Sequence, residues 1–183
     1  MEIGKTVYFS NRAEWRKWLS KHHESEREIW LIYYRKDSGK ARIPYNDAVE
    51  EALCFGWIDS ILKKVDAESF AQRFSPRNPK SRWSEMNKER VRRLVEQGKM
   101  TEAGLAKLGG GVDDLPYEIP DDILEALKAD ENTWENFQRF PESYKRIRVG
   151  WIDGSRNNPE AFSTRLRYFL KMTKQNKRFG MVH

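Results

Sequence analysis

Two segments of the chain concentrate the residue types that could bind a ligand or take part in acid–base chemistry. Residues 45–60 (YNDAVEEALCFGWIDS) end with a tryptophan and a carboxylate, and residues 74–87 (FSPRNPKSRWSEMN) carry two arginines, a tryptophan and an amide. A guanidinium is planar and matches a carboxylate or a phosphate with parallel hydrogen bonds. We therefore predict one cleft that holds a small or anionic ligand and is lined by Trp57, Asp59, Arg77, Arg82, Trp83 and Asn87.

Several of these side chains also have a structural interpretation. Asp59 follows Trp57 closely, and a carboxylate beside apolar surface suits acid–base catalysis. An ion pair with Arg77 would explain the same residue without any ligand. Trp57 and Trp83 can be core residues. The sequence leaves open whether Asp59 and Arg77 close on each other or face a ligand.

No motif of a known catalytic or metal centre occurs in the sequence. The single cysteine, Cys54, excludes an internal disulfide and a multi-cysteine metal site. Its place near the C-terminal end of a predicted helix favours a buried thiol over a nucleophile. Glycine-rich phosphate loops and HExxH are absent. We expect no metal, no cofactor and no classical catalytic centre, and an enzyme of unknown reaction is an alternative.

The uneven charge distribution suggests a second class of partner. Residues 70–100 hold nine basic and three acidic side chains, and residues 136–183 hold 11 basic and three acidic ones. The segment between them, residues 101–135, has two basic and ten acidic side chains, so neutralisation within the fold is the simpler interpretation. The alternative is a nucleic-acid-binding protein that uses basic helices. Its candidate residues are Lys88, Arg90, Arg92, Arg93, Arg165, Arg167 and Lys171.

The elements that would position the predicted cleft begin with a capped helix and a buried strand. Asn11 and Glu14 have the spacing of a capping box at a helix start. Residues 29–34 (IWLIYY) are β-branched and aromatic, which is typical of a strand buried on at least one face.

A second helix and a hairpin then carry the first cleft residues. Asn46 is the predicted N-cap of this helix, and Gly56 is its predicted left-handed stop. Residues 57–66 and 70–74 are predicted to form a hairpin. Simple alternation along its first strand places Asp59 on the same face as Trp57 and Ile61, with Ile58 and Leu62 opposite.

The second half of the chain reads as helices only. Gly109–Gly111 and the residues after them mark the best linker. Beyond it, apolar residues recur at helical spacing in several segments, and two of these open with a proline. We predict an α+β fold, with a small antiparallel sheet and packed helices in domain 1–110 and an all-helical bundle in domain 117–178.

Motifs along much of the chain resemble those of the bacteriocin-protection, YdeI/OmpD-associated family, the OmdA group. They are GWIDS, FSPR with SRWSEMN, QGKMTEAG, and the later run PDDILEAL, FPESYKRIRVGWI and RLRYFL. The resemblance implies an OmdA-like helical domain over 117–178. It also implies a ligand-binding or stress and antimicrobial-peptide-protection role.

The sequence contains no apolar run near 18 residues, so we expect no membrane span. The residues at its start lack the apolar core of a signal peptide. Together with the single cysteine, this predicts a cytoplasmic protein. The sequence does not define an oligomeric state.

Overall fold

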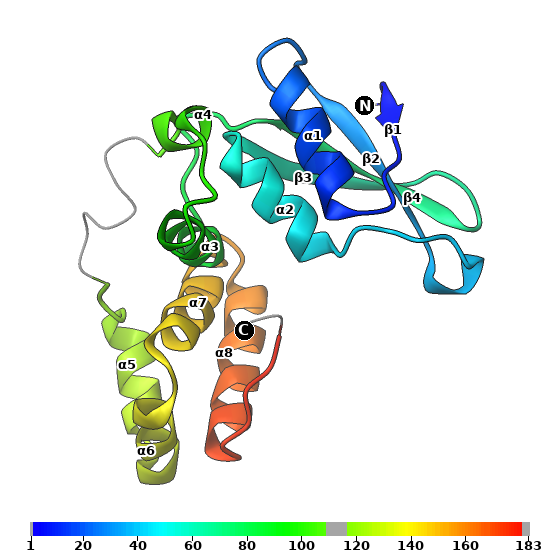
Figure 1. The fold of residues 1–183 in the computed structure, drawn as a ribbon. Coiled ribbons are helices and arrows are strands. Elements are labelled where there is room, and N and C mark those ends of the chain that lie inside the picture. Colours follow the sequence, from blue (N-terminus) through cyan, green and yellow to red (C-terminus); the bar gives the residue numbers. More distant parts are fainter. Residues whose placement is uncertain (1, 109–116, 181–183) are drawn as a thin grey trace. The chain divides into compact units, whose positions relative to one another are not determined.

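The computed structural model describes residues 2–108 and 117–180 (Figure 1). These residues form two compact units. The first contains the described residues up to Ser81 and those from Arg90 to Leu108, and the second contains Arg82–Glu89 and the residues from Tyr117 onward. The predicted linker Gly109–Gly111 lies outside the described residues. The division into domains 1–110 and 117–178 therefore stays a prediction.

A four-stranded sheet forms the centre of the first unit, with the strand order β1-β2-β4-β3. Strands β2, β4 and β3 are antiparallel, whereas β1 runs parallel to β2. The strands are β1 (Thr6–Val7), β2 (Ile29–Tyr34), β3 (Trp57–Lys64) and β4 (Ser69–Pro76). The α+β fold class is thereby confirmed. The sequence analysis missed β1, because two residues carry no periodic pattern.

Helices α1 (Arg12–His22) and α2 (Tyr45–Cys54) lie together on one face of this sheet (Figure 1). The Trp15 ring of α1 lies 5.4 Å from the Phe74 ring of β4, and both side chains are fully buried. The Trp15 indole donates to the carbonyl of Ala48 at 3.0 Å, which satisfies its polar atom inside the core. The other helical segments of the chain up to Leu108 are Lys36–Ser38, α3 (Glu85–Glu96) and α4 (Glu102–Ala106).

Helix boundaries follow the predicted caps with one exception. The Asn11 side chain accepts from the Glu14 amide and caps α1 as predicted. Gly56 has φ +73° after α2, which confirms the predicted left-handed stop. Asn46 is not the N-cap: α2 begins at Tyr45 with Pro44 as its cap. The Asn46 side chain instead accepts a hydrogen bond from Arg90 at 2.7 Å, so a tertiary contact replaces the predicted local one.

The described residues from 117 to 180 are helical in the way the sequence predicts. Their core is contiguous and consists mainly of aromatic and aliphatic side chains from each of four helices. Pro141 precedes α7 and Pro159 opens α8, as expected for proline at a helix start. The helices are α5 (Asp121–Lys128), α6 (Glu131–Arg139), α7 (Glu142–Asp153) and α8 (Pro159–Lys174).

Among the described residues, no helix has the length and apolar character needed to cross a bilayer.

Candidate functional site

An irregularity in β3 decides which side chains accompany Asp59. Asp59 pairs with Phe74 of β4, but Leu62 pairs with Gln72, so three steps along β3 match two along β4. One extra residue in a strand shifts every later side chain to the opposite face. Leu62 therefore shares a face with Asp59. The simple alternation that put Ile61 there was wrong for this reason.

On this face the first unit contains a cavity of about 490 Å³, here called the Tyr33 cavity. Its deep side chains, Tyr33, Ile43 and Gln72, are buried, whereas Tyr45 and Leu62 are exposed at its rim. The cavity is thus open to solvent at one side and mixes polar with apolar walls. The lining residues are Tyr33, Arg42, Ile43, Pro44, Tyr45, Asp59, Ser60, Leu62, Phe70 and Gln72.

Asp59 is held at this cavity by a tyrosine. The Tyr45 hydroxyl donates to Oδ2 of Asp59 at 2.6 Å. Burial first, and this hydrogen bond second, raise the pKa of Tyr45 above its ordinary value. The phenol therefore stays protonated near neutral pH and acts as a donor, not as a base. A carboxylate has about four lone-pair sites, so Asp59 can still accept from a ligand.

The hydroxyl of Tyr33 is the unsatisfied polar group of this cavity. Tyr33 is 3% exposed, and its oxygen makes no hydrogen bond with any described residue. Its ring stacks on Phe70 at 5.5 Å between centroids, which fixes where the hydroxyl lies. Burial raises the pKa of Tyr33, so this group too is a donor near neutral pH. A buried hydroxyl without a partner costs roughly 1–3 kcal/mol, which a suitable ligand would recover.

Two arginines contribute to the charge in and near this cavity. Arg42 lines the cavity, and its Nη1 donates a hydrogen bond of 3.1 Å to the backbone carbonyl of Tyr34. Arg90 is buried, and its pKa is lowered by that burial while attraction to Tyr45 and Asp59 opposes the shift. The lining of the cavity carries one guanidinium, Arg42, and one carboxylate, Asp59, so its formal charges cancel and it suits a neutral polar molecule better than a strong anion.

The predicted cleft residues of the first unit have separate surroundings. Trp57 is buried, donates to the carbonyl of His23 at 3.0 Å, and lines a different cavity of about 400 Å³. Arg77 is buried and donates to the carbonyl of Ser81 at 2.6 Å, and burial lowers its pKa. Asp59 thus accepts its hydrogen bond from Tyr45. Although Trp57 and Asp59 are only two positions apart on β3, their side chains line different cavities.

The remaining predicted cleft residues group with the second unit. Arg82 is exposed and pairs with Asp153 at 3.3 Å. The backbone amide of Asn87 donates to the Ser84 hydroxyl at 3.3 Å, a contact at the start of α3. Trp83 is half-buried. A shared cleft that joins these residues with Asp59 stays a prediction.

The basic residues proposed for nucleic acid make many contacts within their own units. Arg90 is 8% exposed and bonds Asn46, Arg93 pairs with Glu50, and Lys88 pairs with Glu85. Arg165 donates to the carbonyl of Trp151, whereas two further members on α8 are exposed. The exposed pair is Arg167 and Lys171. Arg92 is half-buried.

Sequence reasoning found Asp59 but missed the other polar residues of the Tyr33 cavity. Tyr33 read only as part of an apolar strand, and Tyr45 only as the start of a helix segment. Their meeting depends on pairing between β2 and β4 and on the irregularity in β3. Across the described residues, no group of three or more His, Cys, Asp or Glu side chains is placed to hold a metal ion.

Comparison with known proteins divides the chain in two. Residues 7–107 match the family model described as "Domain of unknown function (DUF8412)". Residues 116–176 match the model described as "Bacteriocin-protection, YdeI or OmpD-Associated", which confirms the resemblance given above. The N-terminal motifs assigned to that resemblance fall within the first match. No curated protein and no solved structure matches the chain.

Proposed function

The chain belongs to the family described as "Domain of unknown function (DUF8412)", and we propose that this part of it is a binding module for small, uncharged polar molecules. The ligand would occupy the Tyr33 cavity. The observation that carries the proposal is the buried hydroxyl of Tyr33, which has no hydrogen-bond partner among the described residues and belongs to a side chain that lines a solvent-open cavity. Buried polar groups in native proteins are nearly always satisfied, so such a group indicates a missing partner.

The polar groups of the cavity define the ligand class. The Tyr33 phenol offers a hydrogen-bond donor. Asp59 offers the acceptor positions of its carboxylate that the hydrogen bond from Tyr45 does not use. Pro44, Leu62 and Phe70 supply apolar walls. A matching molecule carries one hydrogen-bond acceptor, one donor and a flat apolar body. This combination of an apolar pocket with a few converging polar groups is typical of small-molecule sites.

A protective role against antimicrobial peptides is supported by the family resemblance and by no feature of the Tyr33 cavity. It is suggested by the bacteriocin protection that gives its name to the family matched by residues 116–176. Ligand binding at the Tyr33 cavity would be one biochemical step through which such a role operates, and it can be tested directly on the purified chain.

The test uses 3-hydroxybenzamide, whose ring, hydroxyl and carbonyl fit this description, and isothermal titration calorimetry. Tyr33→Phe removes one hydrogen bond and is expected to weaken binding roughly fivefold, which corresponds to about 1 kcal/mol. Asp59→Asn is expected to weaken it roughly tenfold, because it removes a charge-assisted acceptor.

Tyr34→Phe is the matched control. It deletes the same oxygen from the adjacent residue of β2, whose side chain lies on the opposite face of the sheet. Equal effects of Tyr33→Phe and Tyr34→Phe, or no binding of the wild-type chain, would overturn the proposal. In the absence of ligand, Tyr33→Phe should unfold at the same or higher urea concentration than wild type, since it removes an unsatisfied buried group.

A further inference from the structure

The second unit contains a buried cation that has no anionic partner among the described residues. Arg148 on α7 is 6% exposed, and its Nε atom has no hydrogen-bond partner. Within residues 2–108 and 117–180, no carboxylate lies within ion-pair distance of its guanidinium. Burial lowers the pKa of Arg148, yet an arginine keeps its charge in proteins. A buried charge of this kind is costly unless something pairs with it.

Aromatic rings hold the guanidinium in place without neutralising it. Its carbon lies 4.8 Å from the centre of the Phe179 ring and 5.7 Å from those of Tyr144 and Trp151. Gly180 lies so close that a Cβ built there would be 2.6 Å from Nη2 of Arg148. Contacts between a cation and rings contribute about 0.5–2 kcal/mol each and leave the hydrogen-bond donors unused.

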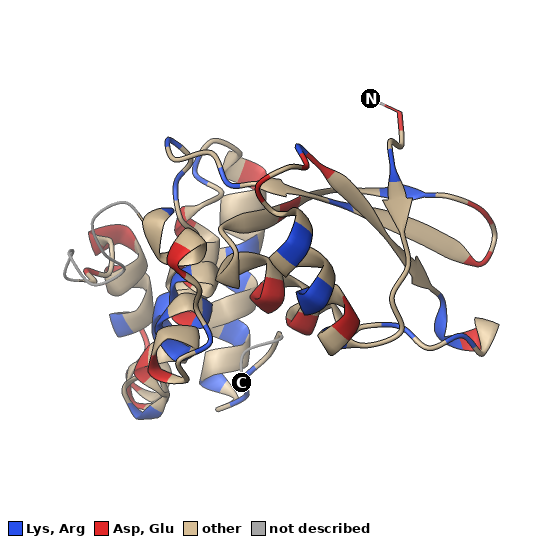
Figure 2. Cartoon of the chain, turned by 45° about the horizontal axis from the view of Figure 1, so that its top comes forward, with Lys and Arg blue, Asp and Glu red and all other residues tan. Residues whose placement is uncertain are grey.

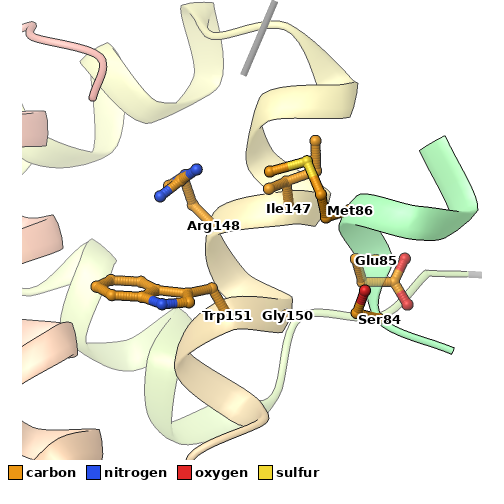
Figure 3. Close-up of a pocket in the computed structure, with 7 residues that line it drawn as sticks. All are labelled: Ser84, Glu85, Met86, Ile147, Arg148, Gly150 and Trp151. Atoms are coloured by element: carbon orange, nitrogen blue, oxygen red, sulfur yellow. The ribbon is translucent and has the colours of Figure 1, made fainter. Parts of the chain in front are cut away.

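The same side chain borders a cavity of about 250 Å³, here called the Arg148 cavity. Figure 3 shows Arg148 and Trp151 on one side of α7 and Glu85 and Met86 on the other, with Ile147 and Gly150 between them. Gly150 lines the cavity beside Glu85, and a Cβ there would lie 2.5 Å from Cγ of Glu85, so an added side chain would displace Glu85 and change the cavity wall. The walls therefore combine one cationic fork with apolar surface.

The one carboxylate of this cavity is already paired. Glu85 accepts from Lys88 at 2.6 Å, and in Figure 3 its carboxylate points away from Arg148. Trp151 has a second arginine on its ring, since Arg165 lies 4.7 Å from its centre and donates to its carbonyl. The local charge around Trp151 is thus positive and lacks a protein counter-ion among the described residues.

We propose that the Arg148 cavity binds a small organic oxyanion, whose charged oxygens face Arg148 and whose apolar body contacts Met86, Ile147 and Trp151. Both a phosphate ester and a carboxylate have the required chemistry, because the planar fork of arginine pairs with either group through two hydrogen bonds. This site differs in charge and in unit from the Tyr33 cavity, so either proposal can fail without the other.

The experiment titrates phenyl phosphate and benzoate into the full chain by calorimetry at constant ionic strength. The wild type is expected to bind at least one of them, and the tighter ligand identifies the anion class. Arg148→Met removes a hydrogen-bonded charge and should weaken binding by roughly 10-fold to 100-fold, while Arg148→Lys, which keeps the charge but loses the fork, should weaken it less. Arg139→Met is the control, because Arg139 is exposed on α6 and pairs with Glu135.

Gly150→Ala provides a variant that leaves Arg148 intact. Its added methyl group displaces Glu85 and changes the cavity wall, which should weaken binding of the same ligand. This variant keeps the test valid if Arg148→Met does not fold. The proposal is overturned if neither oxyanion binds the wild type at concentrations up to about 10 mM. A dissociation constant of that size corresponds to a binding free energy of about 3 kcal/mol. It is equally overturned if Arg148→Met and Arg139→Met bind alike, or if Gly150→Ala binds as tightly as wild type.

Discussion

The two units treat a buried charge in opposite ways. In the first, Glu51 on α2 is 2% exposed and pairs with Arg12 and with Arg16 of α1, the latter at 2.6 Å. Figure 2 colours the acidic residues of α2 red and the basic residues of α1 blue. In the second, Arg148 is nearly as buried but has aromatic rings around it in place of a carboxylate. The Glu51 carboxylate thus has two guanidinium partners, although Nη2 of Arg12 is itself a buried donor without a partner among the described residues, whereas Arg148 has no carboxylate partner among them.

This difference separates structural polar groups from candidate binding groups. A carboxylate that two guanidiniums satisfy gains nothing from a ligand. An unsatisfied buried donor, such as the Arg148 guanidinium or the Tyr33 hydroxyl, gains a full hydrogen bond when an acceptor arrives. All three polar side chains are similarly buried, so what distinguishes them is the number of hydrogen-bond or ion-pair partners among the described residues.

The sharpest test of this contrast is the substitution Glu51→Gln. It leaves Arg12 and Arg16 without their shared counter-charge, and breaking a buried pair costs roughly 3–5 kcal/mol. Because both arginines are partly exposed, we expect a loss of about 2–4 kcal/mol in the free energy of unfolding, measured by urea denaturation. The exposed Glu24 provides the control, and Glu24→Gln should change the value by less than about 0.5 kcal/mol. Similar losses in both variants would remove the contrast.

Substitutions at two glycines test how closely each of the two units is packed. A Cβ at Gly104 would lie 2.2 Å from the carbonyl oxygen of Cys54, which is backbone and cannot move aside cheaply. We expect Gly104→Ala to cost about 2 kcal/mol of stability through overpacking. At Gly150 the obstructing atoms are Cγ and Cβ of Glu85, at 2.5 and 2.9 Å, which lie next to the backbone of α3 but are side-chain atoms, so Gly150→Ala should cost about 1 kcal/mol, less than Gly104→Ala. Urea denaturation of both variants measures the difference, and the reverse order would contradict it.

Arg148→Met should have only a small effect on the protein without ligand. The change relieves the desolvation of an unpaired charge but gives up contacts with Tyr144, Trp151 and Phe179, and these terms oppose each other. We expect the free energy of unfolding to stay within about 1.5 kcal/mol of the wild-type value. A loss as large as that of Glu51→Gln would assign Arg148 a mainly structural role.

An exposed ion pair of the second unit gives the smallest expected effect. Asp130 caps α6, accepts from Thr133 and pairs with Lys174, and these contacts lower its pKa from 3.8 to about 2. A lowered pKa means that its stabilisation is full above about pH 4 and is lost as the pH falls toward 2.

Asp130→Asn should therefore unfold at a lower temperature than wild type at pH 6, with the difference shrinking between pH 4 and pH 2 (thermal denaturation). Asp37→Asn, on the short segment Lys36–Ser38 of the first unit, is the control for removing an acidic side chain. A difference that stays constant with pH would show that the Asp130 carboxylate is not the titrating group.

Local sequence signals were sufficient for most of the fold. The capping residues at Asn11, the apolar run at 29–34 and the glycine at 56 each act within a few residues of themselves, so their structural consequence can be predicted without the rest of the chain. The helices after residue 117 followed from 3.6-residue periodicity for the same reason. The prediction of Asn46 as a cap was wrong because its side chain accepts a hydrogen bond from Arg90, which is distant in the sequence.

By itself the sequence determined the α+β class, the helical second half, the family resemblance and the choice of Asp59 as a residue of interest. The three-dimensional fold was needed to see that Asp59 shares a cavity with Tyr45 and Tyr33, and that Arg148 is buried without a carboxylate partner among the described residues. Periodicity reports which face of an element is apolar. It cannot report an extra residue within a strand or count the hydrogen-bond partners of a buried group, because both depend on contacts between residues far apart in the chain.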